Sequence, residues 1–107
     1  MVPTIRYSAL DPLKLDPAHY KVEIENNQVR VLRLHLKRGE KTPLYEEPFE
    51  RLLVPLTAVR LKVIDPEGKT KNVAYKEAEL QWLSPGKETD ENVGAEPYEA
   101  LIVEFKK

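Results

Sequence analysis

Hydrophobic and polar residues alternate along most of this chain, and a period of two residues is typical of β-strands. The clearest example is residues 20–25, where Tyr20, Val22 and Ile24 are apolar and the residues after each of them are charged. No segment of the sequence keeps apolar residues at helical spacing over three turns. From the alternation we predict strands at residues 20–25, 28–37, 50–56, 58–65, 70–76, 79–83 and 96–105.

Turn-forming residues separate these predicted strands. Asn26-Asn27 favours a tight hairpin, because asparagine tolerates a positive φ. Asp65-Pro66-Glu67-Gly68 carries proline and glycine at the positions that a β-turn favours. Pro55 cannot donate a ladder hydrogen bond, so we expect an edge position or a bulge there. Many short strands joined by turns predict an all-β sandwich or barrel.

The first 18 residues have a different pattern. They contain Pro3, Pro12 and Pro17 and show no sustained periodicity. Proline fixes φ and removes a hydrogen-bond donor, so we predict an extended arm over residues 1–18 and one β-domain over residues 19–107. We expect the arm and the first strand to lie over the domain or to pair with the sheet edge of a partner.

Charge and composition exclude several classes of function. The 17 basic and 18 acidic residues are interspersed, so no basic stripe is available to bind nucleic acid or an anionic membrane. The sequence has no apolar run long enough to cross a bilayer and no secretory signal in its first ten residues, so we expect a cytoplasmic protein. Without cysteine, the chain cannot form disulfides, thiolate metal sites or cysteine nucleophiles.

Two segments, residues 39–48 and 84–94, resemble the two signature motifs of the cupin family. Gly39 matches the opening glycine of the first motif, and Pro43 lies where many small cupins have a proline. Asn92 matches the asparagine that ends the second motif. The resemblance runs from about residue 19 to residue 105, and it implies the cupin double-stranded β-helix, which is a jelly-roll barrel.

The positions that hold the metal ligands of cupins carry other residues here. Tyr45 and Glu47 stand at the two histidines of the first motif. Glu88 stands at the last histidine of the second motif when the spacing is counted back from the asparagine, and Thr89 when it is counted forward from Gly86. The whole chain has two histidines, so a three-histidine metal centre cannot form within one copy.

Three interpretations of Tyr45, Glu47 and Glu88 follow. Two carboxylates and a phenol are hard oxygen donors that suit Mg²⁺, Ca²⁺ or Mn²⁺. Alternatively, two carboxyls held close together in an apolar barrel would share a proton and act as an acid–base pair, with Tyr45 as a donor. The third interpretation places all three on an acidic, solvent-exposed rim, which the sequence favours over a metal site.

The orientation of His35 depends on which face of its strand is buried. Three leucines alternate with Val29, Val31, Arg33 and His35 over residues 28–37. If the leucines pack between the sheets, His35 and Arg33 face the cavity or a partner. If the valines are inside, His35 lies at the edge of the core, and a structural role is favoured for it.

Arg51 is a candidate ligand-binding residue. The glutamate of the first cupin motif falls on Arg51 or Leu52. A guanidinium can bind a carboxylate or phosphate in a bidentate manner. The sequence favours the alternative, a salt bridge with Glu47 or Glu50.

Aromatic residues form the last candidate group. Trp82 and three tyrosines, Tyr20, Tyr75 and Tyr98, share inward positions with aliphatic neighbours in the predicted strands. They could stack a sugar or a planar ligand inside the barrel. The sequence favours packing in the core or in a dimer interface.

Together these observations predict an all-β, cupin-like jelly-roll protein without a metal or another cofactor. We expect a homodimer that acts as a ligand-binding or interaction module, with a small-molecule ligand in the barrel. The alternative is an enzyme of the cupin class, isomerase- or epimerase-like, that uses a hard divalent metal or a metal-free cluster of glutamate and tyrosine.

Overall fold

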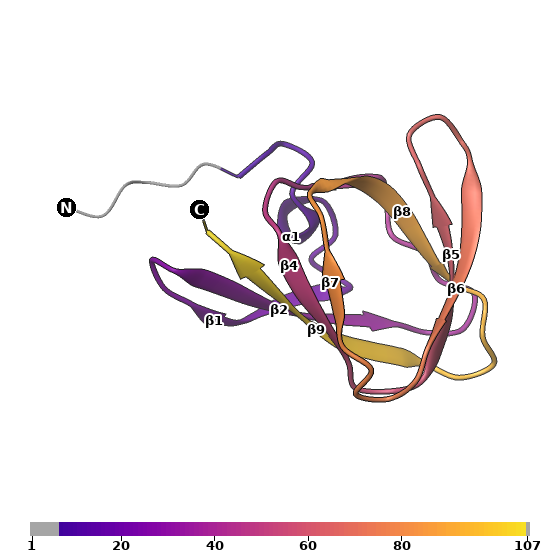
Figure 1. Ribbon diagram of the computed structural model, residues 1–107. Helices are drawn as coiled ribbons and strands as arrows, with labels where there is room; N and C mark the ends of the chain where they lie inside the picture. Colours follow the sequence, from indigo (N-terminus) through magenta and orange to yellow (C-terminus); the bar gives the residue numbers. More distant parts are fainter. Residues whose placement is uncertain (1–6, 107) are drawn as a thin grey trace.

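The computed structural model describes residues 7–106, which form one helical turn and nine strands (Figure 1). In chain order these elements are α1 (Pro12–Leu15), β1 (Tyr20–Glu25), β2 (Val29–Leu36), β3 (Tyr45–Glu47), β4 (Arg51–Pro55), β5 (Val59–Ile64), β6 (Thr70–Tyr75), β7 (Gln81–Leu83), β8 (Gly86–Asn92) and β9 (Tyr98–Phe105). No helix in this part of the chain is long and apolar enough to cross a membrane.

The strands form two antiparallel sheets that face each other. The larger sheet has the order β1-β2-β9-β4-β7, and the smaller has the order β3-β8-β5-β6. Most neighbours in each sheet are far apart in the sequence, as in a jelly roll, and the core lies between the sheets. The structure thus confirms the predicted all-β class.

The inner face of β2 settles the orientation that the sequence left open. Leu32, Leu34 and Leu36 are buried, so they pack between the sheets. Arg33 and His35 therefore lie on the outer face of the larger sheet. His35 does not face the cavity.

The last strand, β9, has apolar residues on both of its faces. Tyr98, Ala100 and Ile102 point inward, and Leu101 and Val103 lie on the outer face. The reason is the register of β9 against β2, which places Ala100 opposite the buried Leu34. Both alternating sets of this strand are largely apolar, so its pattern alone could not choose between them.

Trp82 is placed differently from the prediction. It lies on the outer face of β7 and is 58% exposed, so it lines no part of the barrel interior. Its ring stacks on Phe105, with 5.2 Å between the ring centroids. Tyr20 and Tyr98 are buried in the core, as predicted.

Pro55 ends β4, which lies between β9 and β7. The pairing of β4 with β7 stops at Leu53, so Pro55 has a strand partner only in β9. Pro55 therefore lies at the end of an inner strand, where one of its two sides has no neighbouring strand and resembles a sheet edge.

The N-terminal segment contains a helical turn that the sequence analysis did not predict. Asp11 caps α1 by accepting a hydrogen bond from the Lys14 backbone, and Pro12 occupies the first helical position, where its missing N–H costs nothing. The backbone of Glu46 donates to the carbonyl of Leu10 at 2.9 Å, which ties the segment to β3. Residues 1–6 of the predicted arm lie outside the described residues.

A buried ionic network joins this segment to the larger sheet. The Arg30 guanidinium, 2% exposed, contacts the carboxylates of Asp11 at 2.6 Å and of Glu104 at 2.5 Å. The Tyr7 ring covers the guanidinium, with 3.9 Å from its centroid to the guanidinium carbon. These contacts satisfy a charge that would otherwise be very costly to bury.

Glu47 lies beside this network and is itself buried. Burial raises the pKa of Glu47 well above its ordinary value, and the neighbouring carboxyl of Glu104 raises it further. The positive charges of Arg51 and Arg30 oppose the shift and are too weak to reverse it. We therefore assign a proton to Glu47 at neutral pH.

Replacing Arg30 should strongly destabilise the fold. In Arg30→Leu, Asp11 and Glu104 stay buried without their cation, which should cost about 3–5 kcal/mol in the free energy of unfolding measured with urea. Arg33→Leu is the matched control on the outer face of the same strand, where exposed pairs with Glu99 and Glu23 contribute at most about 1 kcal/mol. Equal losses in the two variants would contradict the structural role of Arg30.

The protonation of Glu47 predicts a pH-dependent stability. The folded protein holds this proton at pH values where the unfolded chain has lost it. The contribution of the proton to the free energy of unfolding is therefore complete below the pKa that Glu47 has in the unfolded chain. The free energy of unfolding then falls as pH rises, by up to about 1.4 kcal/mol per pH unit.

Glu47→Gln keeps the shape of the protonated acid and removes this dependence. Its stability relative to the wild type should therefore rise steadily from pH 5 to pH 8 in urea titrations. Glu50→Gln, at an exposed position, controls for the loss of one negative charge. A constant difference between Glu47→Gln and wild type across this range would show that Glu47 is ionised in the folded protein.

Candidate functional site

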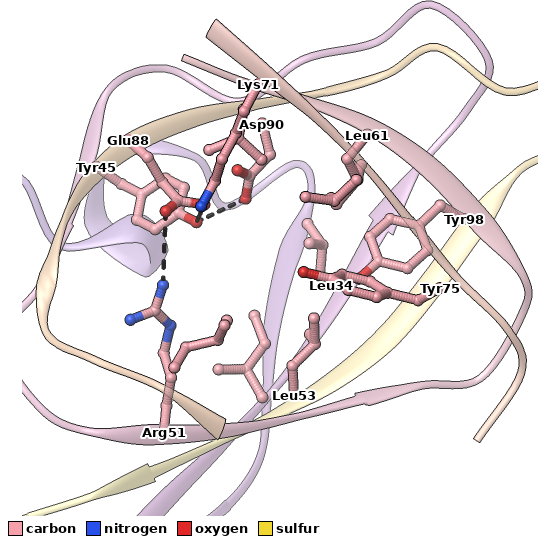
Figure 2. A pocket seen from close by; sticks show the side chains of 14 residues that line it. Leu34, Tyr45, Arg51, Leu53, Leu61, Lys71, Tyr75, Glu88, Asp90 and Tyr98 are labelled. Atoms are coloured by element: carbon pink, nitrogen blue, oxygen red, sulfur yellow. Dashed lines mark hydrogen bonds and ion pairs between the residues drawn. The ribbon is translucent and has the colours of Figure 1, made fainter. Parts of the chain in front are cut away.

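A small cavity lies between the two sheets, inside the barrel (Figure 2). Its volume is about 50 Å³. Leu34, Leu53 and Ile102 of the larger sheet and Leu61 of the smaller sheet form an apolar wall. Polar side chains gather on the opposite side: Tyr45, Arg51, Glu88 and Asp90.

The pairing of β3 with β8 builds the polar side. Tyr45 lies directly opposite Glu88 in this antiparallel pair, so their side chains share one face. Alternation along β8 then places Asp90 and Asn92 on the same inward face. Arg51 reaches the cluster from β4 in the larger sheet (Figure 2).

Tyr45 connects the two carboxyls of the cluster. Its hydroxyl oxygen lies 2.6 Å from Asp90 Oδ2 and 3.1 Å from Glu88 Oε2, so its single proton can serve either oxygen. Burial raises the pKa of Asp90 well above its ordinary value, and a hydrogen bond with Glu88 adds to the shift. Both effects favour the protonated form of Asp90, and burial keeps the Tyr45 phenol protonated as well.

Arg51 is buried but makes few close contacts. Its Nη1 donates to the carbonyl of Ser84 at 2.9 Å. Nη2 lies 3.9 Å from Glu88 and Nε lies 3.7 Å from Glu47, which are ion-pair distances too long for hydrogen bonds. Arg51 thus brings a positive charge to the cavity. Its Nη2 and Nε make no close hydrogen bond to the described residues and are left to donate to a ligand.

Two further polar atoms at the cavity have no hydrogen-bond partner among the described residues. They are Asp90 Oδ1 and the Tyr98 hydroxyl, and both are buried. Tyr98 and Tyr75 lie on the side of the cavity opposite Tyr45 (Figure 2). Burial raises the pKa of Tyr98 above its ordinary value, so its phenol is a potential hydrogen-bond donor.

The structure brings together only some of the residues that the sequence proposed. Tyr45, Glu88 and Arg51 meet at the cavity. Glu47 lies on the same inward face as Tyr45, but it packs toward the Arg30 network and does not line the cavity. The predicted exposed acidic rim is wrong for Tyr45 and Glu47, which are buried.

Asp90 is the site residue that sequence reasoning missed. The sequence analysis predicted no strand over residues 84–94, so it did not use the alternation of that segment. The spacing Glu88, Asp90, Asn92 is the signal that was available, since it puts three polar residues on one face of a strand. Lys71, which also lines the cavity, had no distinguishing pattern.

Gly39 and Asn92, which carried the resemblance to cupin motifs, have structural roles. Gly39 adopts a φ of 81°, and its backbone donates to the Asn92 carbonyl at 2.9 Å. The Asn92 side chain donates to the carbonyls of Leu36 and Glu96 and accepts from the Gly94 backbone. The two motif segments therefore hold each other in place.

The cavity residues do not fit a divalent metal. Burial favours the protonated forms of Tyr45 and Asp90, which are poor metal ligands, and the Arg51 guanidinium already provides a positive charge beside Glu88. Among residues 7–106, no group of three or more histidine or carboxylate side chains is placed to hold an ion.

Comparison with known proteins places the fold. No family model matches the sequence, and no curated protein matches it either. A cupin domain from Bordetella pertussis has a TM-score of 0.77 at 20% identity, over 82% of this chain and 92% of that one. An RmlC-like cupin from Methanocaldococcus jannaschii has a TM-score of 0.62 at 16% identity, over 98% of this chain and 92% of that one.

Enzymes also occur among the similar structures. A variant of oxalate decarboxylase from B. subtilis has a TM-score of 0.56 at 19% identity, over 73% of this chain and 21% of that longer one. Identities at this level compare folds and not activities. The chain has the double-stranded β-helix fold of cupin proteins.

Proposed function

We propose that this protein binds a small organic molecule inside the barrel. The observation that carries the proposal is a cavity bordered by two buried polar atoms without partners, Asp90 Oδ1 and the Tyr98 hydroxyl, and by the loosely paired Arg51 guanidinium. Unpaired buried polar groups cost free energy in the unliganded protein. A ligand that completes their hydrogen bonds recovers that cost.

The cavity is suited to a short, amphipathic ligand. A volume of 50 Å³ holds only a few heavy atoms, since one water needs about 10–15 Å³ on this scale. A second, more open pocket of about 250 Å³ shares Val63, Lys71 and Glu88 with the cavity. A longer ligand could therefore extend toward the surface past Lys71.

Charge favours a carboxylate as the polar end of the ligand. Arg51 and Lys71 are cationic, whereas burial favours the neutral form of Asp90 and leaves Glu88 as the acidic counterpart. The wall around the cavity then carries a net positive charge. A carboxylate can accept from the unused donors of Arg51, and its apolar tail would lie against Leu34 and Leu53.

Short carboxylates should stabilise the protein through Arg51. We expect acetate, propionate or butyrate to raise the melting temperature relative to chloride at equal ionic strength. The rise should be roughly 4–8 °C for each 1 kcal/mol by which binding stabilises the folded protein. The matching amides, such as propionamide, should have a smaller effect. Calorimetry then gives the dissociation constant.

Arg51→Gln should abolish this stabilisation, while Arg33→Gln, with the same loss of charge on the outer face, should retain it. If no carboxylate raises the melting temperature of the wild type, the proposed ligand class is wrong. The same conclusion follows if Arg51→Gln responds as the wild type does.

A second candidate function is metal-free acid–base catalysis. Burial favours a proton on Asp90, next to the Glu88 carboxyl, and Tyr45 hydrogen-bonds both. Such a pair of carboxyls can donate a proton to a bound ligand and accept another from it. The sequence analysis proposed Glu47 for this pair, and the geometry supports Asp90 in its place.

Proton transfer would be visible as hydrogen exchange. In deuterated water, pyruvate incubated with the protein should lose its methyl proton signals in NMR spectra as deuterium replaces hydrogen at the carbon beside the carbonyl. The rate should fall to the uncatalysed level in Asp90→Asn and remain in Glu50→Gln. An exchange rate equal to that without protein would leave the site as a binding site only.

A further inference from the structure

A second pocket adjoins the barrel cavity near the turn that joins β5 to β6. Its volume is about 250 Å³, and three lysines line it: Lys69, Lys71 and Lys87. We call it the lysine pocket. It shares Val63, Lys71 and Glu88 with the cavity, so these side chains form the border between the two spaces.

Lys71 connects the lysine pocket to the polar side of the cavity. In the register of the smaller sheet, Val63 of β5 lies opposite Lys71 of β6 and opposite Asp90 of β8. Directly opposed residues of antiparallel strands point to the same side, so Lys71 leaves the sheet on the inward face that Asp90 occupies. Figure 2 shows Lys71 on the same side of the cavity as Glu88 and Asp90. A ligand that reaches from the cavity into the lysine pocket would pass along Lys71.

The amines of the lysine pocket are not neutralised by neighbouring side chains. None of the three lysines forms an ion pair with a carboxylate within residues 7–106. The nearby Asp65 accepts hydrogen bonds from the backbones of Glu67 and Lys69, at 2.9 Å each, through its Oδ1. A single exposed lysine commonly has no partner, but three around one pocket concentrate positive potential there and favour an anion.

The cavity and the lysine pocket together carry an excess of positive charge. Four cationic side chains line them: Arg51, Lys69, Lys71 and Lys87. Two carboxylates oppose these cations, Asp65 and Glu88, while burial raises the pKa of Asp90 and favours its neutral form. Four positive and two negative charges leave an excess of two, which a ligand with two negative charges would balance.

We infer that the ligand of the barrel is a short acid that carries a second anionic group, a carboxylate or a phosphate, and that the lysine pocket binds this second group. The inference rests on the proposed function, because Arg51 holds the first carboxylate inside the cavity. The buried guanidinium is planar and fits a carboxylate, whereas lysines are flexible point charges that suit either kind of anion. The chain between the two groups would pass Val63, which lines both spaces.

Calorimetry with pairs of acids of equal chain length tests the inference. Malonate, succinate and glutarate are compared with propionate, butyrate and pentanoate, and 3-phosphonopropionate carries a phosphonate in place of the second carboxylate. At least one dianion should bind about fivefold more tightly than its matched monocarboxylate, as expected for an exposed ion pair at the upper end of its range. This advantage should shrink as ionic strength rises. Comparing succinate with 3-phosphonopropionate then identifies the second anionic group.

Two double variants show where the second group binds. Lys69→Gln combined with Lys87→Gln changes exposed residues that line the lysine pocket and not the cavity. This variant should lose the advantage of the dianion over its matched monocarboxylate. Lys21→Gln combined with Lys76→Gln is the control, because it removes the same charge at exposed positions outside both spaces and should keep the advantage. Circular dichroism melts establish that both variants keep the fold.

The outcomes separate this inference from the proposed function. Equal affinities for every dianion and its matched monocarboxylate would overturn the inference and leave the proposed function standing. The inference is also wrong if the variant of Lys69 and Lys87 keeps the advantage, or if the control loses it equally. If no acid binds, both the proposed function and the inference fail. Both fail too if Arg51→Gln binds the dianions as tightly as the wild type does, because the ligand would then occupy the lysine pocket alone.

Discussion

The register between β2 and β9 is the constraint on which the rest of this structure depends. This register decides which face of each strand is buried, because it pairs Leu34 with Ala100 and Arg30 with Glu104. The same pairing fills the core with leucines, brings a buried cation to a buried carboxylate, and turns Val31 and Val103 outward. A shift by one residue would reverse all three at once, because the side-chain period of a strand is two. The charged pair disfavours such a shift, since it would move a desolvated ion away from its partner.

The sequence was sufficient for the fold class but not for the orientation of every strand. Alternation located most of the strands, and Gly39 and Asn92 indicated the jelly roll through the turns they form. The orientation predicted for Trp82 of β7 was wrong, and the pattern of β9 could not choose a face, because apolar residues occupy outward positions in both strands. A pattern of hydrophobicity assumes that apolar means inward, and this assumption fails on a face that is itself apolar.

The candidate site shows a related limit. Tyr45 and Glu88 could be predicted to meet, because the resemblance placed them at equivalent positions of two motifs. The place of Asp90 in the site and the surroundings of Glu47 could not be predicted. Both depend on which carboxyl is buried and on which cation lies beside it. Burial and charge pairing are properties of the assembled barrel, and they cannot be read from a run of acidic residues in the sequence. In the barrel interior, burial raises the pKa of Glu47 and Asp90, so bound protons offset part of the acidic charge there.

The contact between Asp11 and Arg30 has a consequence for how the chain opens. Terminal segments commonly fray in exchange with solvent at little cost in free energy. Here, lifting α1 away would expose a desolvated guanidinium and remove one of its two carboxylates. The amides around α1 should therefore exchange with deuterium together with those of β2 and β9, in one cooperative unit. The segment that precedes the barrel in sequence thus belongs to its most protected part.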